Sequence, residues 1–322
     1  MKKRKIISII GTRPEFIKIS AIIGYLEKQF NHKIIHTGQH YNKEMNYDFF
    51  EEFNLTAPDF NLKTGSGSFA QQTAKMILGC EKVFTLEKPK AVLVFGDTNS
   101  TLCGALAAAG NNIPVIHIEA GMRSFDKSMP EEKNRIVCDH LSSLLLCPSK
   151  YAVDCLQKEG IAKNVFFTGD LNYDILLKTK IDTNITGRLN LTGKEFYFLT
   201  IHRQENTNDL ARLEKILQTL SKLPHTVVFP VHPRTEKLLS KINFDTRNYI
   251  FTKPLKFSQS LALQKGARAI ITDSGNLLRV SLTALRLYGF RNLPLRPADG
   301  YPQFSTGICS FGNIFVFTAT IP

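Results

Sequence analysis

The sequence predicts an α/β fold in which two domains each contain a parallel sheet. Short apolar runs, typical of strands buried on both faces, alternate along the chain with segments of helical pattern. One series begins at Ile6–Ile10 and another at Phe196–Thr200, and the turn-rich segment 168–192 separates them. The 322 residues suffice for two domains that each bury a core. We therefore expect two doubly wound, Rossmann-like domains, over residues 1–170 and 171–322.

The first domain is predicted from strands and helices that alternate in order. The expected strands are Ile6–Ile10, Lys33–Thr37, Ala91–Phe95, Val115–Ile118, Leu144–Cys147 and Val165–Phe167. The expected helices are Pro14–Gln29, Met45–Phe53, Phe69–Glu87 and Thr98–Ala109. Pro14 suits a first helical turn because its fixed φ is helical and its missing N–H is not needed there. The Ala- and Leu-rich helix that begins at Thr98 suits close packing on a sheet.

The second domain repeats the alternation. Its expected strands are Phe196–Thr200, Thr226–Phe229, Tyr249–Phe251 and Ala269–Thr272. Its expected helices are Asp209–Leu223, Arg234–Lys241 and Phe257–Lys265. Polar residues follow three of the strands, including His202, His232 and Ser274. Ligands of open α/β sheets bind beyond the carboxyl ends of the strands, so we expect a ligand in a cleft between the domains.

Composition narrows the partners. The formal net charge of +13 makes an anionic partner plausible, and nucleic acid, a membrane surface or a phosphorylated metabolite would each fit that charge. The aromatic content is 10%, Trp is absent, and no nucleic-acid-binding motif is found, which disfavours nucleic acid. No apolar run reaches membrane-spanning length. The six Cys residues lack metal-site spacing, and together with the lack of a signal peptide they favour a reducing cytoplasm.

Two carboxylates follow neighbouring strands of the first domain. Asp97 comes directly after Ala91–Phe95, and Glu119 after Val115–Ile118. Because the carboxyl ends of parallel strands meet at one edge, we expect both acids in one crevice, where they could exchange protons with a ligand. The alternative is that Asp97 only caps the following helix and Glu119 pairs with a nearby Arg.

Cationic residues lie near the same edge. Arg13 stands at a strand end beside a helix N-terminus, a place suited to a phosphate. Lys18 follows one turn later and either faces the same way or is an exposed helix lysine. Glu131 and Arg135 are four residues apart on an expected helix and share a face. They are either a surface ion pair or bring a third acid to the crevice.

An ordered set of motifs is now apparent. It comprises Gly11-Thr12-Arg13-Pro14-Glu15, His36-Thr37-Gly38-Gln39-His40, Gly96-Asp97-Thr98-Asn99-Ser100-Thr101, Glu119-Ala120-Gly121-Met122-Arg123, Pro130-Glu131-Glu132 with Asn134-Arg135, His202-Arg203-Gln204-Glu205-Asn206 and Asp273-Ser274-Gly275. In this order and spacing, the set closely resembles the non-hydrolysing UDP-N-acetylglucosamine 2-epimerases. Each motif alone is weak, but the ordered set is strong, and the resemblance covers about residues 4–275.

The resemblance implies a fold, a reaction and a setting. The fold would be like that of the GT-B glycosyltransferases, with a UDP-sugar in the interdomain cleft. The reaction would interconvert UDP-GlcNAc and UDP-ManNAc by elimination and re-addition of UDP, which supplies precursors of surface polysaccharides. It needs no metal and no nicotinamide cofactor. We also expect a cytoplasmic homodimer.

The resemblance also implies site residues. The catalytic candidates are Asp97, Glu119, Glu131 and His202. The substrate-binding candidates are Arg13, Lys18, Gln39, His40, Arg135, His232, Ser274 and Gly275. A carboxylate would remove the proton at C2, cations would stabilise the departing UDP, and His202 could steady or protonate the leaving phosphate. Which acid is the base stays open.

The sequence departs from the family after Gly275. The family continues Asp-Ser-Gly-Gly-x-x-Glu-Glu, whereas this chain has Asn276 in place of the second Gly and Arg279-Val280 in place of the two Glu. Asn276 adds a side chain where backbone should approach phosphate, and neither Arg279 nor Val280 can accept ribose hydrogen bonds. We therefore expect weak UDP binding and little turnover.

Two origins of this departure remain open. A frameshift near codon 276 would leave the second domain incomplete, and the protein a degenerate, inactive family member. Genuine divergence would instead suit a different nucleotide sugar, such as a UDP-diacetamido-uronic acid.

Overall fold

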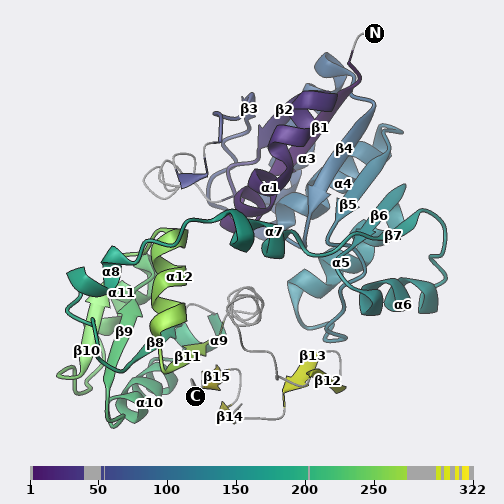
Figure 1. Cartoon of the computed structure of the whole chain (residues 1–322). Helices are drawn as coiled ribbons and strands as arrows, with labels where there is room; N and C mark the ends of the chain where they lie inside the picture. Colours follow the sequence, from purple (N-terminus) through teal and green to yellow (C-terminus); the bar gives the residue numbers. More distant parts are fainter. Residues whose placement is uncertain are drawn as a thin grey trace. The chain divides into compact units, whose positions relative to one another are not determined.

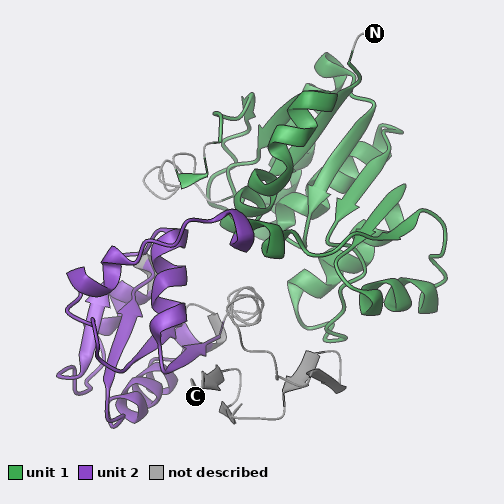
Figure 2. Ribbon diagram, in the orientation of Figure 1, with its two compact units in different colours: residues 1–175 green, residues 176–322 purple. Residues whose placement is uncertain are grey.

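In the computed structural model, the described residues are 3–39, 52–53, 55–201, 204–273, 295–298, 301–304, 309–311 and 314–318. The candidate site residues His40, His202, Ser274 and Gly275 lie outside them, as do Asn276, Arg279 and Val280 and most of the helix expected at 45–53. The chain divides into two compact units, unit 1 over Met1–Ile175 and unit 2 over Leu176–Pro322 (Figure 2).

Unit 1 is built on a parallel seven-stranded sheet in the order β3-β2-β1-β4-β5-β6-β7 (Figure 1). The strands are β1 (Lys5–Ile10), β2 (Asn31–His36), β3 (Phe60–Asn61), β4 (Ala91–Phe95), β5 (Val115–Ile118), β6 (Leu144–Cys147) and β7 (Val165–Phe167). The helices are α1 (Arg13–Gln29), α3 (Phe69–Glu87), α4 (Asn99–Gly110), α5 (Pro130–Leu141), α6 (Lys150–Lys158) and α7 (Leu171–Lys178).

Alternate side chains of β1 build cores on opposite faces of this sheet. Ile7 and Ile9 pack in a cluster with residues of α3, α4 and α5. Ile6 and Ile10 pack in another cluster with Phe16 of α1. Burying each of these aliphatic side chains stabilises the folded protein by about 1.5–3 kcal/mol. The two clusters therefore hold helices on both faces of the sheet. The helices are thereby wound on both faces, which leaves the carboxyl ends of the strands to form the site.

Unit 2 has a six-stranded sheet in the order β10-β9-β8-β11-β15-β14, and β12 pairs separately with β13. The strands are β8 (Phe196–Thr200), β9 (Thr226–Pro230), β10 (Tyr249–Thr252), β11 (Ala269–Thr272), β12 (Leu295–Ala298), β13 (Tyr301–Phe304), β14 (Cys309–Phe311) and β15 (Ile314–Thr318). The helices are α8 (Asn184–Arg188), α9 (Gln204–Thr207), α10 (Leu210–Leu220), α11 (Pro233–Leu239) and α12 (Phe257–Gly266). Strands β8 to β11 pair in parallel, whereas β15 runs antiparallel to β11.

The predicted α/β fold of two doubly wound, parallel-sheet domains is confirmed, and the structure adds elements. Helix α6 was not predicted, although Ala152, Cys155 and Leu156 form the helically spaced face that it buries. The segment 168–192, expected to be turns, contains α7 and α8 because Ile175 and Ile185 find apolar neighbours to bury against. Within the part of the chain that the structure describes, each helix is too short or too polar to cross a bilayer.

Candidate active site

The site of unit 1 forms where β1, β4 and β5 end side by side. The register pairs β4 with both neighbours, so the turns that begin at Gly11, Gly96 and Glu119 share one edge of the sheet. Space there is tight, because a methyl group at Gly11 would lie 2.0 Å from Thr37 Oγ1 and 2.1 Å from Ser100 Oγ. Only glycine permits this close approach.

Glu15 ties the first turn to the second. One carboxylate oxygen of this buried side chain accepts the backbone N–H groups of Gly11 and Thr12, at 2.6 and 2.8 Å. The other oxygen accepts the hydroxyl of Thr98 at 2.5 Å. Burial raises the pKa of Glu15, while these hydrogen bonds oppose the rise. Thr98 in turn accepts Thr101 N and is the N-cap of α4. The helix cap is therefore Thr98 and not Asp97, which removes the alternative that Asp97 serves only as a cap.

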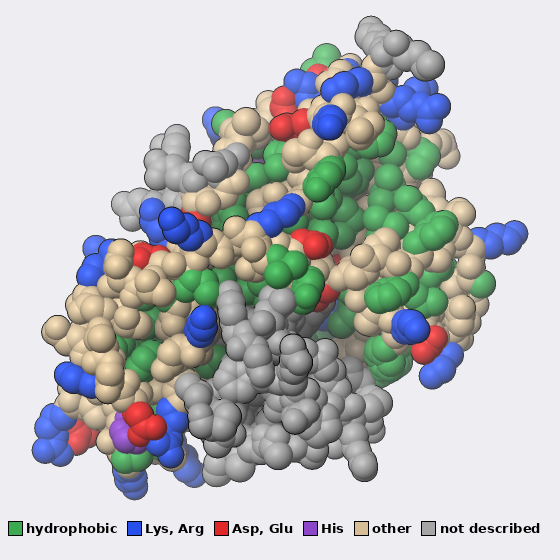
Figure 3. Space-filling model, in the orientation of Figure 1, with side chains coloured by type: hydrophobic (Ala, Val, Ile, Leu, Met, Phe, Trp, Pro, Cys, Tyr) green, Lys and Arg blue, Asp and Glu red, His purple; other side chains and the backbone are tan. Residues whose placement is uncertain are grey.

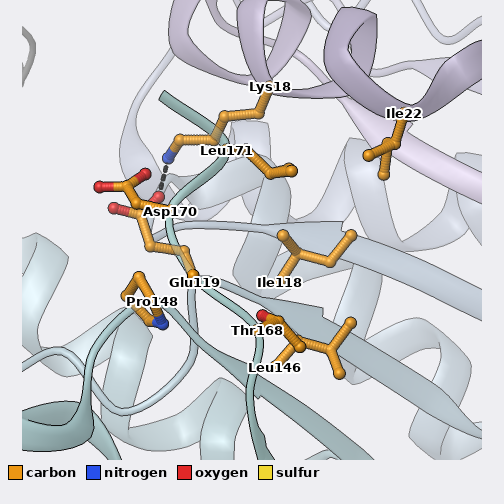
Figure 4. Close-up of a pocket in the computed structure, with 10 residues that line it drawn as sticks. Lys18, Ile22, Ile118, Glu119, Leu146, Pro148, Thr168, Asp170 and Leu171 are labelled. Carbon is orange, nitrogen blue, oxygen red and sulfur yellow. Dashed lines mark hydrogen bonds and ion pairs between the residues drawn. The ribbon is translucent and has the colours of Figure 1, made fainter. Parts of the chain in front are cut away.

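Glu119 pairs with Lys18 across the crevice (Figure 4). Both side chains are almost buried, at 10% and 6% exposure. The pair also approaches the neighbouring turn, because a methyl group at Gly96 would lie 2.9 Å from Lys18 Nζ. Lys18 is thus a crevice residue rather than an exposed helix lysine, and it is a partner of Glu119. Glu119 has a φ of +74°, a left-handed conformation that costs a non-glycine residue about 1–3 kcal/mol.

A cavity opens beside this pair. Figure 4 shows Lys18 pointing toward the carboxylates of Glu119 and Asp170. Burial raises the pKa of Asp170, although hydrogen bonds from Asn172 and the charge of Lys18 lower it. Apolar side chains also line the cavity, namely Ile22, Ile118, Leu146, Pro148 and Leu171. Asp170 was not predicted as a site residue.

Asp97 pairs with Arg135 of α5. Two nitrogens of the guanidinium contact the same oxygen, Asp97 Oδ2, with Nε at 2.9 Å and Nη2 at 2.8 Å. Arg135 Nη1 also donates to Glu132 Oε2 at 2.6 Å. Glu132 is buried and accepts Ser124 N and Phe125 N, so it also holds the loop before α5. The predicted face of Glu131 and Arg135 is therefore refined, because the acid that binds Arg135 at helical spacing is Glu132, and Glu131 is exposed in the first turn.

The other predicted residues of unit 1 lie around the same edge. Gln39 Oε1 accepts Ser100 N at 3.0 Å and Ser100 Oγ at 2.7 Å, so it links the end of β2 to the first turn of α4. Arg13 begins α1, next to the N-cap Thr12. Desolvation lowers the pKa of Arg13 to about 10 against the opposing charge of Glu52, so the guanidinium is still cationic near neutral pH.

In unit 2, polar side chains also gather at the strand ends. Asn206 of α9 donates to the buried Asp273, which follows β11, at 3.0 Å. Thr200 and Thr272 join the ends of β8 and β11 through their hydroxyls at 2.7 Å. His232 follows β9 and is exposed. The strand ends of unit 2 therefore carry polar side chains as well, while His202, Ser274 and Gly275 lie outside the described residues.

Parallel sheets with acids, cations and hydroxyls at their carboxyl ends define this protein as a doubly wound α/β enzyme. A family model of UDP-N-acetylglucosamine 2-epimerase matches residues 25–283. The chain therefore belongs to the UDP-N-acetylglucosamine 2-epimerase family.

Individual relatives agree with this assignment. The UDP-N-acetylglucosamine 2-epimerase of Methanocaldococcus jannaschii is 42% identical over 290 residues, which cover 85% of this chain and 79% of the relative. The UDP-2,3-diacetamido-2,3-dideoxy-D-glucuronate 2-epimerase of Pseudomonas aeruginosa is 38% identical over 282 residues, with the same coverage of 85% and 79%. The crystal structure of the M. jannaschii UDP-GlcNAc 2-epimerase in complex with UDP-GlcNAc and UDP has a TM-score of 0.81 at 39% identity, covering 87% of this chain and 82% of that chain.

Proposed function

We propose that this protein is a non-hydrolysing epimerase that interconverts UDP-GlcNAc and UDP-ManNAc. The observation that carries the proposal is the pair of carboxylates after neighbouring strands, each matched with a cation. Asp97 pairs with Arg135 and Glu119 with Lys18. Membership of the family and the similarity to an enzyme solved with UDP-GlcNAc and UDP support the same substrate class.

The proposed reaction removes and then returns UDP. One carboxylate takes the proton from C2 of the sugar while the bond between C1 and the phosphate oxygen breaks. This step forms 2-acetamidoglucal and UDP, whose new negative charge the cations near the strand ends stabilise. UDP then adds back at C1 while an acid delivers a proton to the other face of C2. The two carboxylates supply this acid–base capacity, and no other reactant is consumed.

Deuterium exchange tests this mechanism. In D₂O, UDP-ManNAc formed from UDP-GlcNAc by the chain with the family motif restored after Gly275 should carry deuterium at C2, which proton NMR detects as loss of the C2–H signal. Glu27 is an exposed residue of α1, and the control variant Glu27→Gln should take up the same amount of deuterium at C2. Epimerised product that retains its original C2 proton would exclude elimination.

A diacetamido-uronic acid is the second candidate sugar, because the P. aeruginosa relative that acts on such a sugar is 38% identical. Competition between the two UDP-sugars for one enzyme preparation decides between them. We expect the higher kcat/KM with UDP-GlcNAc, and a higher value with the uronic acid would reassign the substrate.

We further infer that the enzyme works in the cytoplasm as a homodimer. The five cysteines within the described residues are all free and buried, which is compatible with a reducing compartment. The Lys and Arg side chains are scattered over both units on the face shown in Figure 3, as expected for a metabolite enzyme rather than a nucleic-acid binder. Sedimentation velocity would test the dimer.

A further inference from the structure

A buried chain of charged and polar side chains lies beneath the two strand ends that carry Asp97 and Glu119. His117 Nδ1 is 2.7 Å from Asp139 Oδ1, and both side chains are fully buried. Arg123 Nη1 donates to Asp139 Oδ2 at 2.6 Å. Arg123 also forms a two-pronged contact with Glu159, with N···O distances of 2.6 and 2.7 Å. The chain thus joins β5, α5 and the C-cap residue of α6.

This buried chain ends on the backbone of both acid-bearing turns. His117 Nε2 lies 2.7 Å from the carbonyl oxygen of Gly96, the residue before Asp97. A carbonyl oxygen only accepts, so Nε2 carries the proton of this bond. On the other side, Asp139 Oδ2 accepts the N–H of Gly121, two residues after Glu119, at 3.1 Å. One histidine–aspartate pair therefore touches both turns.

One residue of these turns has a conformation that needs such support. Gly96, Glu119 and Gly121 all lie in the left-handed region, with φ of +65°, +74° and +75°. The two glycines adopt this region freely, but for Glu119 it is sparsely populated and persists where surrounding contacts hold it. Gly121 is also packed against the backbone, because a methyl group there would lie 2.3 Å from the carbonyl oxygen of Ala152. Small shifts of these turns would move the two carboxylates relative to each other.

The electrostatics make the pair strong. Burial alone raises the pKa of Asp139, but the charges and hydrogen bonds of His117 and Arg123 outweigh it and hold that pKa below its usual value. Asp139 is therefore a carboxylate that accepts from His117, Arg123 and Gly121 together. Charge-assisted bonds in a buried site are stiff and about twice as strong as neutral ones.

We propose that His117 and Asp139 are positioning residues that set the separation and direction of the Asp97 and Glu119 carboxylates for proton transfer at C2 of the sugar. The proposal rests on the proposed function of the site. Neither side chain touches the crevice, since both are fully buried below it. Misplacement of reacting groups by about 1 Å can cost about 100-fold in rate, so such a device affects turnover more than binding.

Two substitutions at one position separate the two hydrogen bonds of the ring. The amide nitrogen of His117→Gln can take the place of Nε2 and donate to Gly96. The amide nitrogen of His117→Asn can take the place of Nδ1 and donate to Asp139, but this variant loses the hydrogen bond to the carbonyl oxygen of Gly96. The matched control is Tyr249→Phe in unit 2, which removes a different buried hydrogen bond, from the Tyr249 hydroxyl to Leu217 O at 2.8 Å.

Turnover, UDP affinity and thermal stability are then compared across the three variants. We expect His117→Asn to lower kcat about 100-fold with UDP affinity within about threefold, and His117→Gln to lose less than about tenfold. Tyr249→Phe should lower Tm similarly and leave kcat unchanged. Equal kcat in His117→Asn and His117→Gln, or a loss in Tyr249→Phe as large as that in His117→Asn, would overturn the proposal.

Hydrogen exchange supplies a readout that does not need turnover. Amides of the turn 96–99 should exchange faster in His117→Asn than in the wild type, and at nearly the wild-type rate in His117→Gln. Equal exchange in both variants would overturn the positioning role even if the wild type proved inactive. An inactive wild type with the expected exchange pattern would instead refute the proposed function alone.

Discussion

Lys18 and Glu119 are separated by 101 positions in the chain and yet form a nearly buried ion pair at the crevice. Burying two charges costs free energy unless they are paired, so these residues differ from solvent-exposed surface charges. Asp97 is less enclosed, with 31% of its side chain exposed, and its bond to Arg135 orients it. At the residue scale, the site therefore contains one enclosed acid and one more open acid, each held by its own cation.

Amide substitutions at these two acids test their chemical roles. Asp97→Asn and Glu119→Gln retain size but cannot accept a proton from C2, so we expect kcat to fall about 10²–10⁴-fold. UDP affinity should change much less, because the acids serve proton transfer rather than nucleotide binding. Steady-state kinetics beside calorimetry with UDP would measure both. Parallel losses of kcat and UDP affinity would contradict the assignment.

At the element scale, β1 is the strand against which the site is assembled. It pairs with β2 and β4, and α1 starts three residues after it ends. Helix α4 approaches β1 closely, since a methyl group at Gly104 would lie 2.9 Å from Ile9 Cγ1. This close packing fixes the start of α4, and thus Thr98 and Ser100, beside the end of β1. The pairing of β1 with β2 also partly buries His32, whose Nε2 lies 2.8 Å from Ser8 Oγ.

His32 makes the stability of this sheet depend on pH. Burial lowers the pKa of His32 from 6.5 to about 4, although the charge of Asp59 opposes the shift. Between these values the unfolded chain binds a proton that the folded protein does not, so stability is lost as pH falls from about 6.5 toward 4. Urea unfolding at several pH values should show a shallower loss for His32→Gln than for the wild type. Identical pH dependence of the unfolding free energy in the two proteins over this range would refute the prediction. Above pH 7.5, where His32 is neutral in both the folded and the unfolded chain, the two proteins should show the same pH dependence, which serves as the control.

At the scale of the whole molecule, most of the chain matches the family, whereas the sequence after Gly275 departs from the family motif. The family model ends at residue 283, and the described part of the tail contributes β15, which pairs antiparallel with β11. The apolar run Ile314–Phe317 suits a strand of such a sheet. Unit 2 thus completes a six-stranded sheet with a strand outside the matched region.

Restoring the family motif tests how the departure affects nucleotide binding. The triple change Asn276→Gly, Arg279→Glu and Val280→Glu rebuilds Gly-x-x-Glu-Glu, with a carboxylate for the ribose. One regained charged hydrogen bond contributes about 1.5–3 kcal/mol, so UDP affinity should rise about 10–100-fold. Calorimetry would measure it, with the exposed Lys222→Glu as a control for added negative charge. An unchanged affinity, with steady turnover in the unmodified chain, would identify Asn276 and Arg279 as a working variation.

The sequence by itself determined the α/β class, every strand up to β11 except the two-residue β3, and the ordered motifs that place acids at strand ends. Strands such as Ala91–Phe95 and Val115–Ile118 were predicted at their observed bounds because apolar runs between turn residues are a local signal. The tertiary structure alone decided the partners. Local spacing pointed to Glu131 and Arg135, but folding brings Arg135 to Asp97 and Glu132. The links from His117 to Asp139 and from Lys18 to Glu119 arise in the same way, because ion pairs depend on distances between segments that only the packed sheet brings together.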